Sequence, residues 1–512
     1  MQECAIELKN VTKSFGEVKA NDNISMKIMR GEILSLLGEN GSGKTTLMNM
    51  LSGIYYPDSG QILVDGKEVV INSPKDAFSY GIGMIHQHFK LVDVLSAAEN
   101  VVLGLPGKTV LDMKTASEKI KNIADKYHFV VNPDKKVYEM SVSEKQTLEI
   151  IKVLYRGADI LILDEPTAVL TPQETRKLFE VLRSMREDGK AIVIITHKLH
   201  EVMELADRVA VLRKGAYVGD LKVSETTPEE MTKMMVGRSV TLNIDRPLPV
   251  NPTPCLEVKG LKVIDKEGLT RLDNVSFTAM SGEILGIAGI AGSGQKELLE
   301  SISGLQTVAA GSVIYTPPGK EASELIGKSA RKIREEGVAM AFVPEDRLGM
   351  GLVGGMGMTG NMMLRSWKDG SGFFINRKNP NDLAKKIKDD LEVVTPNVDY
   401  PVRRLSGGNV QKVLVGREIA SSPSVLMTAY AVRGLDINTS YTIYNLMTEQ
   451  KKKGVAVIFV GEDLDVLLEL CDRILVMYDG KVSGIVDART ATKEQIGFMM
   501  THMPEEKGGP NE

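Results

Sequence analysis

Residues 38–46 read Gly38-Glu39-Asn40-Gly41-Ser42-Gly43-Lys44-Thr45-Thr46 and fit the pattern G-x-x-x-x-G-K-[ST] completely. The stretch follows an apolar run, residues 33–37, and precedes an apolar helical pattern that begins near Thr45. Glycines at these spacings let successive backbone N–H groups turn towards phosphate oxygens, and the N-terminus of the helix adds a favourable dipole. We expect Lys44 to reach the β- and γ-phosphates of a nucleotide and the Thr45 hydroxyl to hold Mg²⁺. This phosphate loop, residues 38–45, predicts a strand–loop–helix unit of an α/β fold.

Two acidic residues follow a second apolar run. Residues 160–165 read Ile160-Leu-Ile-Leu-Asp164-Glu165, so a buried strand would deliver Asp164 to its carboxyl end. A carboxylate oxygen there suits Mg²⁺, which prefers hard oxygen ligands. Glu165 would then lie beside the γ-phosphate, where it could polarise an attacking water. His197 follows another apolar run, residues 192–196, and is a candidate contact to the γ-phosphate.

The chain contains two copies of one pattern. Gly31-Glu-Ile-Leu-Ser-Leu-Leu-Gly recurs as Gly282-Glu-Ile-Leu-Gly-Ile-Ala-Gly, 251 positions later, whereas Asp207-Arg208 recurs as Asp472-Arg473, 265 positions later. The second copy is therefore about 14 residues longer than the first, and we place the extra residues at 317–328. A repeat of this length predicts two similar domains and not a solenoid of many short repeats.

Each copy alternates short β-branched runs with helical patterns. The runs at 32–37, 160–163 and 191–196 and the helical pattern at 172–188 predict a mostly parallel sheet that is covered on both faces. The fold class is therefore α/β, twice.

Domain boundaries follow from the repeat and from proline. We expect a first domain at 1–241 and a second at 255–502. Between them, residues 242–254 contain four prolines, which favour an extended spacer. The polar residues 503–512 predict a disordered tail.

Composition excludes several classes of protein. The 512 residues are 43% hydrophobic and 25% charged, as in an ordinary globular protein. The net charge of −4 gives no overall basic field for a nucleic acid. Three widely separated cysteines (Cys4, Cys255 and Cys471) cannot form a disulfide framework or a four-cysteine zinc site. The N-terminus lacks the pattern of a signal peptide, and no stretch approaches the roughly 18 apolar residues of a membrane span. We expect a cytoplasmic chain that meets a membrane only through a partner.

The order of the motifs resembles that of the ATP-binding cassette (ABC) ATPases. The phosphate loop is followed by Gln87, by a serine-containing helix start, by Asp-Glu-Pro-Thr at 164–167 and by Thr-His at 196–197. The resemblance covers nearly the whole chain, in two copies. It implies that each copy has a mostly parallel sheet core, an antiparallel β subdomain and a helical subdomain. It also implies that the chain binds and hydrolyses ATP with Mg²⁺.

The resemblance gives roles to further residues. Phe15 would stack on the adenine, and Gln87 would join Thr45 and Asp164 at Mg²⁺ and link that site to a membrane subunit. Residues 168–172 would contact the other cassette, although the usual aspartate of the family is absent there. In this family the phosphate loop of one cassette faces the Leu-Ser-Gly-Gly signature of the other, so that two cassettes share their nucleotides.

The two signature segments of this chain differ. The second reads Leu405-Ser406-Gly407-Gly408-Asn409-Val410-Gln411 and is intact; the resemblance assigns ATP contacts to Ser406, Gly407, Gly408 and Gln411. The first reads Met140-Ser141-Val142-Ser143-Glu144-Lys145-Gln146, where both glycines are replaced and a carboxylate is introduced. The side chains at Val142 and Ser143 would hinder the close approach of backbone to phosphate that glycine allows.

The second copy also lacks the catalytic residue types. Its loop reads Gly289-Ile-Ala-Gly292-Ser293-Gly294-Gln295-Lys296, so that Gln295 stands where the first copy has Lys44. Lys296 comes one residue late, and on a helix it would point about 100° away from the required direction. Ala429-Tyr430 replace Asp164-Glu165, Glu462 replaces His197 and Glu345 replaces Gln87. We therefore expect one working ATP site, made by the first phosphate loop and the second signature, and one degenerate site.

The transport function is suggested by resemblance alone. Two fused cassettes with a degenerate second half resemble the ATP-binding subunits of bacterial importers for simple sugars and nucleosides. The segment Ile82-Gly-Met-Ile-His86-Gln87-His88-Phe89 looks like the nucleoside branch, and a ribose- or galactose-type sugar importer is the alternative. The implied partners are two integral membrane permease subunits and, indirectly, an extracytoplasmic substrate-binding lipoprotein. No nucleic acid and no direct contact with the transported substrate are expected, and the location is the cytoplasmic face of the cell membrane.

Other classes fit less well. A soluble tandem cassette acting on ribosomes usually carries a long charged linker and two intact signatures, which this chain lacks. A tandem DNA-repair cassette would need inserted zinc-binding cysteines. A regulatory module that only binds nucleotide would not need Asp164, Glu165 and His197 together.

Overall fold

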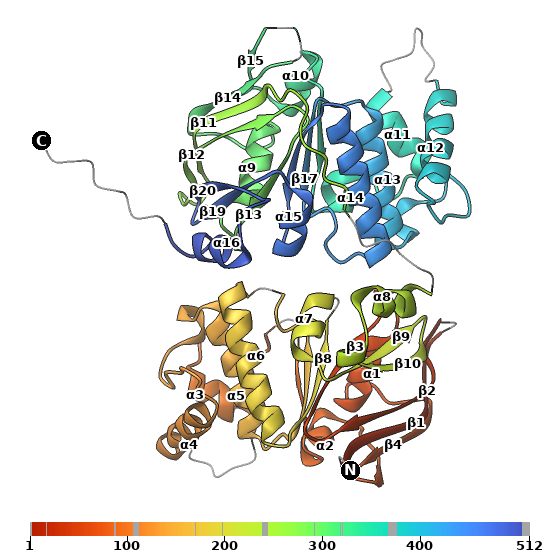
Figure 1. Cartoon of the computed structure of the whole chain (residues 1–512), viewed down its shortest axis with the longest axis vertical. Coiled ribbons are helices and arrows are strands. Elements are labelled where there is room, and N and C mark those ends of the chain that lie inside the picture. Colours follow the sequence, from red (N-terminus) through yellow and green to blue (C-terminus); the bar gives the residue numbers. More distant parts are fainter. Residues whose placement is uncertain are drawn as a thin grey trace, which may run out of the picture. The chain divides into compact units, whose positions relative to one another are not determined.

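The computed structural model describes residues 3–16, 18–86, 89–105, 112–168, 170–196, 198–237, 244–290, 292–317, 319, 321–366 and 376–503. The chain divides into two compact units, Met1–Thr241 and Leu242–Glu512. Figure 1 labels most of their helices and strands, and each unit is described by itself. Among the described residues, no helix is both long enough and apolar enough to cross a lipid bilayer.

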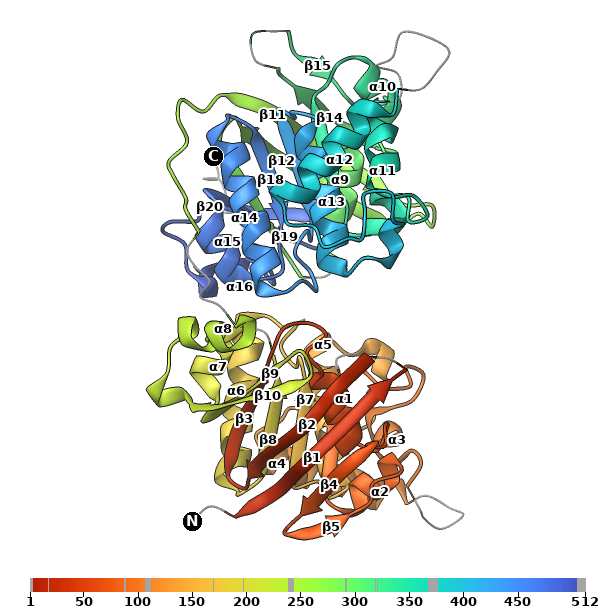
Figure 2. The same ribbon diagram turned by 90° about the vertical axis from the view of Figure 1, so that its right-hand side faces the viewer.

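The first unit contains two sheets. The antiparallel sheet has the strand order β2-β1-β4-β5, and Figure 2 shows it face-on. The second sheet has the order β10-β9-β3-β8-β7-β6, in which only the β10–β9 pair is antiparallel among the described strands. The strands are β1 (Cys4–Phe15), β2 (Val18–Met29), β3 (Glu32–Leu37), β4 (Ser59–Val64), β5 (Lys67–Val69), β6 (Ile82–Ile85), β7 (Ile160–Asp164), β8 (Ala191–Ile195), β9 (Arg208–Arg213) and β10 (Ala216–Lys222).

Helices cover the parallel sheet of the first unit and form a separate group beside it. The helix α1 packs in the core between the two sheets, whereas α6 packs on the opposite face of the parallel sheet. The group α3, α4 and α5 has its own apolar core and is the predicted helical subdomain. The helices are α1 (Lys44–Leu51), α2 (Pro74–Ser79), α3 (Ala97–Val102), α4 (Met113–Lys126), α5 (Val142–Tyr155), α6 (Pro172–Glu187), α7 (Leu199–Leu205) and α8 (Pro228–Val236), with short 3-10 turns at η1 (Val137–Glu139) and η2 (Val223–Glu225).

The second unit repeats this architecture. Its antiparallel sheet has the order β12-β11-β14-β15, and its mostly parallel sheet has the order β16-β17-β18-β13-β19-β20. The strands are β11 (Pro254–Ile264), β12 (Thr270–Met280), β13 (Ile284–Ala288), β14 (Ala310–Tyr315), β15 (Ser323–Glu324), β16 (Met340–Val343), β17 (Val425–Ala429), β18 (Ala456–Val460), β19 (Arg473–Tyr478) and β20 (Lys481–Asp487). The helices are α9 (Gln295–Ile302), α10 (Ala330–Glu335), α11 (Met358–Ser366), α12 (Lys378–Asp390), α13 (Gly407–Ala420), α14 (Ile437–Lys452), α15 (Leu464–Leu470) and α16 (Lys493–Met499), with short turns at η3 (Arg347–Gly351) and η4 (Val402–Arg404).

The predicted fold is confirmed. Continuous apolar strands lie in the centre of each parallel sheet: all residues of β3 and of β8 are buried, as are all residues of β13 and of β18. Such strands are covered on both faces by helices or by the second sheet, which is the arrangement expected of parallel sheets. The runs predicted at 160–163 and 191–196 are β7 and β8, and the helical pattern at 172–188 is α6.

The extra length of the second unit is distributed more widely than the sequence suggested. The strands β4 and β14 begin at residues 59 and 310, which are 251 positions apart, and the helices α2 and α10 begin at 74 and 330, which are 256 apart. Only about five of the extra residues therefore fall in the predicted region, 317–328. The helices α4 and α12 begin at 113 and 378, which are 265 apart, so the remaining residues lie between α10 and α12. The sequence comparison used only motifs near the start and near the end of each copy, so it could not locate the extra residues between them.

Part of the proline-containing segment packs on the second unit. Ile244 is 8% exposed and belongs to the core beside α14 and α15. The guanidinium of Arg246 donates to the carbonyl oxygens of Leu468 and Cys471 at 2.6 and 2.8 Å, at the end of α15. Lys452 pairs with Asp245 at 2.8 Å. These contacts anchor residues 244–246 to the second unit, so that this part of the segment is not a free spacer.

Candidate nucleotide-binding site

The phosphate loop of the first unit connects the carboxyl end of β3 to the first turn of α1. Gly41 and Gly43 have φ values of 80° and 98°, in the left-handed region that favours glycine. A Cβ atom at Gly43 would collide with the carbonyl oxygen of Ala20, so the loop packs against β2 too closely for any side chain there. Asn21, which is fully buried, donates from its side-chain amide to the Gly43 carbonyl oxygen at 3.1 Å. The backbone of the loop is thus held in place by packing and by a hydrogen bond.

Some residues of the phosphate loop are exposed and could contact a ligand, whereas others are buried and support the loop. Ser42 is 2% exposed and directs its backbone N–H to the Glu39 carbonyl oxygen at 3.0 Å. Asn40, Gly41 and Thr45 are exposed, whereas Gly38 is buried. Glu39, Gly43, Lys44 and Thr46 are half-buried. The loop therefore presents an exposed rim over a buried base, with the N-terminus of α1 at one end.

Lys44 and two acids meet at this edge of the sheet. The Lys44 ammonium donates to the carbonyl oxygens of Gly38 and Glu39 at 2.7 and 3.0 Å. Burial lowers the pKa of Lys44, and the negative charges of Glu165 and Asp164 oppose that shift. Burial also raises the pKa of Asp164 to about 6, with a further contribution from the neighbouring Glu165. Carboxyl oxygens at this edge are ligands of the kind that Mg²⁺ prefers.

The substitution Asp164→Asn should stabilise the protein in the absence of nucleotide and metal at pH 7 to 8. A folded-state pKa raised from 3.8 to about 6 means that stability is lost as the pH rises through about 6. Asparagine carries no charge, so the difference in Tm between variant and wild type should appear above about pH 6 and vanish near pH 4. Thermal unfolding in EDTA at both pH values measures it. The control Asp58→Asn should not stabilise the protein at pH 7, because Lys13 and the Ser14 N–H lower the pKa of Asp58.

The backbone at Glu165 is bent in an unusual way. Its φ is 47°, which is uncommon for a residue other than glycine and costs conformational energy. Its N–H donates to the Ile195 carbonyl oxygen at 2.9 Å, which ties the turn after β7 to the end of β8. Strained residues of this kind cluster at functional sites. The turn places Glu165 directly after Asp164, at the same edge as Lys44.

Phe15 lies at the end of β1 and is 45% exposed. Its ring meets that of Tyr55 edge to face, with centroids 5.2 Å apart, and the Lys13 ammonium lies 5.7 Å from its centre. An exposed aromatic face beside a cation is suited to stacking on a base. Tyr55 was not predicted from the sequence, because nothing in its position marks it as a neighbour of Phe15.

The second loop keeps the backbone of the first and lacks its charge. Gly292 and Gly294 have φ values of 88° and 96°. The side chain of Gln295 is 2% exposed and donates from Nε2 to the Ile290 carbonyl oxygen at 3.1 Å, a contact equivalent to that of Lys44 with Glu39. A Cβ atom at Gly289 would collide with the same amide, so Gln295 fills the base of the loop. Ser293 is buried as well.

Lys296 does not replace the missing cation. Its side chain is 58% exposed and lies 3.8 Å from Glu300, one turn further along α9. The Lys296 side chain therefore lies on the outer face of the helix, and it points away from the loop as the sequence predicted. In the second loop, a neutral amide takes the place of the ammonium.

An ion-pair network occupies the corresponding sheet edge of the second unit. Arg433 pairs with Glu345 at 2.6 Å and with Glu462 at 3.1 Å. These two acids stand where the first copy has Gln87 and His197. The Arg433 guanidinium also lies 5.8 Å from the ring of Tyr430, which replaces Glu165 and whose pKa is raised to about 12 by burial. The second unit thus closes this edge with its own charges; the part that Arg433 plays was not predicted.

The two signature segments also differ in their capping. Ser406 is the N-cap of α13, and its hydroxyl oxygen accepts a hydrogen bond from the side-chain amide of Asn409 at 2.8 Å. Ser141 caps α5, but Glu144 bonds back to the Ser141 N–H at 2.7 Å and pairs with Lys135 at 2.6 Å. The first signature helix therefore already carries an anion of its own at its N-terminus, where the second has a neutral asparagine. At the first signature the Glu144 carboxylate already occupies the Ser141 N–H, whereas the second signature has no acidic residue at this position.

The glycines of the second signature lie among polar side chains. A Cβ atom at Gly407 would come within 3.2 Å of Arg347, and one at Gly408 within 3.2 Å of Thr439. Gln411 lies further into α13 and is 1% exposed, and neither polar atom of its amide has a hydrogen-bond partner among the described residues. The contact of Gln411 with nucleotide stays a prediction. Gln87 and His197 lie outside the described residues, and their roles stay predictions too.

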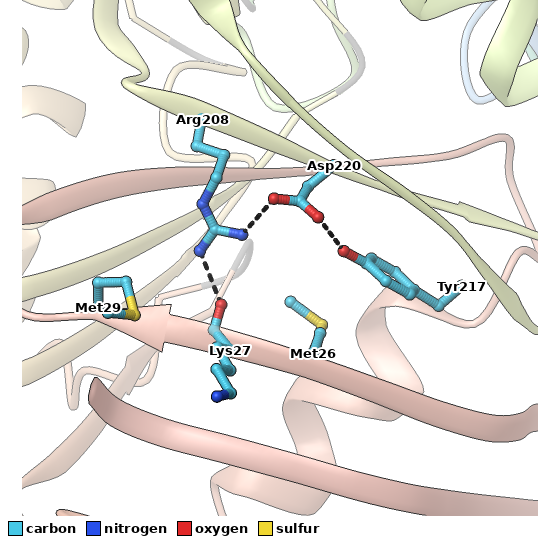
Figure 3. Close-up of a pocket in the computed structure, with 6 residues that line it drawn as sticks. All are labelled: Met26, Lys27, Met29, Arg208, Tyr217 and Asp220. Atoms are coloured by element: carbon cyan, nitrogen blue, oxygen red, sulfur yellow. Dashed lines mark hydrogen bonds and ion pairs between the residues drawn. The ribbon is translucent and has the colours of Figure 1, made fainter.

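A cavity in the first unit lies at the other end of the sheet. It measures about 400 Å³ and is lined by Met26, Lys27, Met29, Arg208, Tyr217 and Asp220 (Figure 3). Arg208 begins β9 and pairs with Leu34, whereas the phosphate loop follows Leu37 at the opposite end of β3. Arg208 donates to Glu32, to Asp220 and to the Lys27 carbonyl oxygen.

The same arrangement recurs in the second unit. There Arg473 donates to Glu283 and to the Thr278 carbonyl oxygen. A contact that both copies keep, although only one of them has the catalytic residues, serves the fold. We therefore infer that Arg208, beside this cavity, holds the two sheets together and does not bind a ligand.

The fold and the geometry of the loop define a phosphate-binding α/β protein, and comparison with known sequences gives its family. The profile of the family described as ABC transporter matches residues 21–168 and 272–428, once in each unit. The chain belongs to this family, and its two cassettes are ATP-binding ATPase domains, as the order of motifs predicted.

Relatives that match along almost the whole chain are proteins of similar length. The chain is 38% identical to a nucleoside import ATP-binding protein of Lactococcus lactis subsp. cremoris over 97% of this chain and 98% of the relative. It is 39% identical to a guanosine import ATP-binding protein of Bacillus subtilis over 99% of both chains. It is 35% identical to a ribose import ATP-binding protein of Caldanaerobacter subterraneus over 96% of this chain and 98% of the relative.

Proposed function

We propose that the chain is the ATP-hydrolysing subunit of an importer and that the imported compound is a nucleoside. The observation that carries the proposal is full-length similarity to import ATP-binding proteins, of which the nucleoside and guanosine relatives are 38% and 39% identical. The ribose relative, at 35%, supports a sugar importer as the second candidate. The two alternatives share the same chemistry, because the cassettes do not touch the transported compound.

The competent ATP site would combine the phosphate loop of the first unit with the signature of the second. Lys44 would bind the β- and γ-phosphates, and Ser406, Gly407 and Gly408 would contribute N–H groups and a hydroxyl at a helix N-terminus. The proposal is supported by charge: Lys44 has no cationic equivalent in the second loop, and Ser406 has no acidic residue at the position where Ser141 has Glu144. The damaged loop and the damaged signature would form the other, non-hydrolytic site.

The residues of the first unit would divide the chemistry of hydrolysis. Glu165 would accept a proton from the attacking water. Thr45, Asp164 and Gln87 would hold Mg²⁺, which when bound neutralises the charge of the phosphates. His197 would contact the γ-phosphate, and Phe15 would stack on the adenine. Asp164 must be ionised to bind a cation, so its raised pKa predicts weaker Mg²⁺ binding below about pH 6.

The proposed partners are two integral membrane permeases, with a substrate-binding lipoprotein on the far side of the membrane. The chain would then lie at the cytoplasmic face of the membrane and be held there by the permeases. ATP binding would close the cassettes around the nucleotide and so switch the permeases, and hydrolysis would release them.

Reconstitution with the permeases tests this proposal. The chain should co-purify with two multi-span permeases, and vesicles that contain the complex and the binding lipoprotein should take up labelled guanosine in an ATP-dependent manner. Labelled ribose in a parallel assay serves as the comparison. Uptake of ribose without guanosine would replace the nucleoside assignment by the sugar assignment. Association with ribosomes and not with permeases would contradict import altogether.

A further inference from the structure

A buried carboxylate lies directly behind the catalytic edge of the first unit. Glu201, in α7, is 5% exposed. It accepts hydrogen bonds from the hydroxyls of Thr167 and Thr196, at 2.6 and 3.2 Å, and pairs with the Lys198 ammonium at 3.1 Å. Burial of an ionised carboxylate costs free energy unless the group is paired and hydrogen-bonded. These partners therefore explain why Glu201 can be buried.

The partners of Glu201 flank the catalytic residues. Thr167 is 2% exposed and stands two residues after Glu165, in the turn that follows β7. Thr196 is 4% exposed and directly follows β8, and its hydroxyl accepts from the Lys198 N–H at 3.1 Å. The Lys198 ammonium also lies 3.4 Å from the Thr167 carbonyl oxygen. Glu201 thus joins the turn that carries Glu165 to the end of the neighbouring strand.

The turn itself is tightly folded. The Ala168 N–H donates to the Glu165 carbonyl oxygen at 3.2 Å, and the Glu165 N–H donates to the Ile195 carbonyl oxygen. The strained φ of Glu165 requires that its surroundings hold it in place. The hydrogen bond from the Thr167 hydroxyl to the Glu201 carboxylate ties this turn to α7.

The cluster is not itself a ligand site. The cavity that Glu201, Thr167 and Thr196 share measures about 10 Å³, which admits at most about one water molecule. Any effect of Glu201 on a nucleotide must therefore pass through the residues that it holds.

The second unit lacks the cluster and keeps the fold. The four equivalent positions are occupied by Val432, Gly461, Asp463 and Val466. The backbone bond between the two strand ends survives, because the Tyr430 N–H donates to the Val460 carbonyl oxygen at 3.1 Å, and Tyr430 has a φ of 50°. The turn can therefore form without a buried carboxylate. The cluster is present only in the copy that has Asp164 and Glu165.

We propose that Glu201 is a positioning residue for ATP hydrolysis, which orients Glu165 through Thr167; this rests on the proposed role of Glu165 as the base. The Glu201 carboxylate fixes the Thr167 hydroxyl and, with it, the turn from which the Glu165 side chain extends towards the nucleotide. Thr196 and Lys198 fix the adjoining strand end in the same way. Loss of the carboxylate leaves ATP binding in place and makes the base less well oriented.

The variants Glu201→Gln and Glu201→Ala test the proposal in the full chain. Glutamine keeps the shape but turns an amide N–H₂ towards the Lys198 ammonium or the threonine hydroxyls. We expect kcat to fall about tenfold for glutamine and up to about a hundredfold for alanine, as for other groups that orient a reacting residue. The Kd for MgATP should stay within about twofold of the wild-type value. Thr167→Val removes the same hydrogen bond from the other partner and should lower kcat in the same direction.

Two controls separate positioning from a general loss of structure. Glu32→Gln changes a carboxylate of equal burial, 5% exposed, that pairs with Arg208 at the opposite end of β3; it should lower Tm and leave kcat within about twofold. In the Glu165→Gln background, Glu201→Gln should lower kcat no further, because residues that act through one another are not additive.

Three outcomes decide between the possibilities. A Glu201→Gln enzyme with wild-type kcat would overturn the inference, provided that Glu165→Gln lowers kcat in the same assay. Parallel losses in kcat, MgATP affinity and Tm would overturn it in favour of a structural role. If Glu165→Gln hydrolyses ATP as fast as the wild type, the proposed base is wrong, and that failure is distinct from the first two.

Discussion

Glu165→Gln should lower the rate of ATP hydrolysis by about 10²- to 10⁴-fold and leave the Kd for MgATP within about twofold. Glutamine has the size of glutamate but cannot accept the proton of an attacking water, and a positioned base contributes about that factor. The structure favours an effect on rate, because Glu165 lies in a strained turn at the same edge as Lys44 and Asp164. Steady-state hydrolysis and equilibrium binding of MgATP measure the two quantities separately.

The matched control is Tyr430→Phe in the second unit. Tyr430 occupies the equivalent turn, with a similar φ and an equivalent backbone hydrogen bond, but it carries no base. Removal of its hydroxyl should leave turnover within about twofold. A large loss from Tyr430→Phe, or no loss from Glu165→Gln, would contradict the assignment of hydrolysis to the first loop.

Most of the fold could be predicted because its elements leave local signals. The apolar runs of β3, β7 and β8 are continuous, and the phosphate loop ends one of them with a glycine pattern that few other structures use. Parallel strands bring their carboxyl ends to one edge, so the meeting of Lys44 with Asp164 and Glu165 follows from the strand assignments alone. The repeat then extends the same prediction to the second half.

The contacts that distinguish the two copies could not be predicted in the same way. Arg433 joins Glu345 and Glu462 across 88 and 29 positions of sequence, and Glu201 reaches back 34 positions to Thr167. Such pairs depend on side-chain directions that a single sequence does not reveal. Glu144 is the exception. A serine followed three residues later by glutamate at a helix start is the pattern of a capping box. The hydrogen bonds between Ser141 and Glu144 in the first signature could therefore have been predicted from the sequence.

Lys44→Ala should weaken MgATP binding at the competent site by about tenfold to a hundredfold and reduce hydrolysis to near background. A hydrogen bond to a charged group contributes about 1.5–3 kcal/mol, and every 1.4 kcal/mol corresponds to a tenfold change in affinity. Alanine also leaves the carbonyl oxygens of Gly38 and Glu39 without the ammonium that they accept from. Titration with a fluorescent ATP analogue and steady-state hydrolysis measure both effects.

Gln295→Ala is the comparison that tests the asymmetry, because the two side chains occupy equivalent places in their loops. Gln295 donates a neutral hydrogen bond to Ile290 and carries no charge to a phosphate. Its removal should therefore leave most of the turnover, and any loss should appear as lower stability of the second unit. If Gln295→Ala reduced hydrolysis as much as Lys44→Ala, the second loop would have to take part in the reaction. That result would contradict the assignment of hydrolysis to a single competent site.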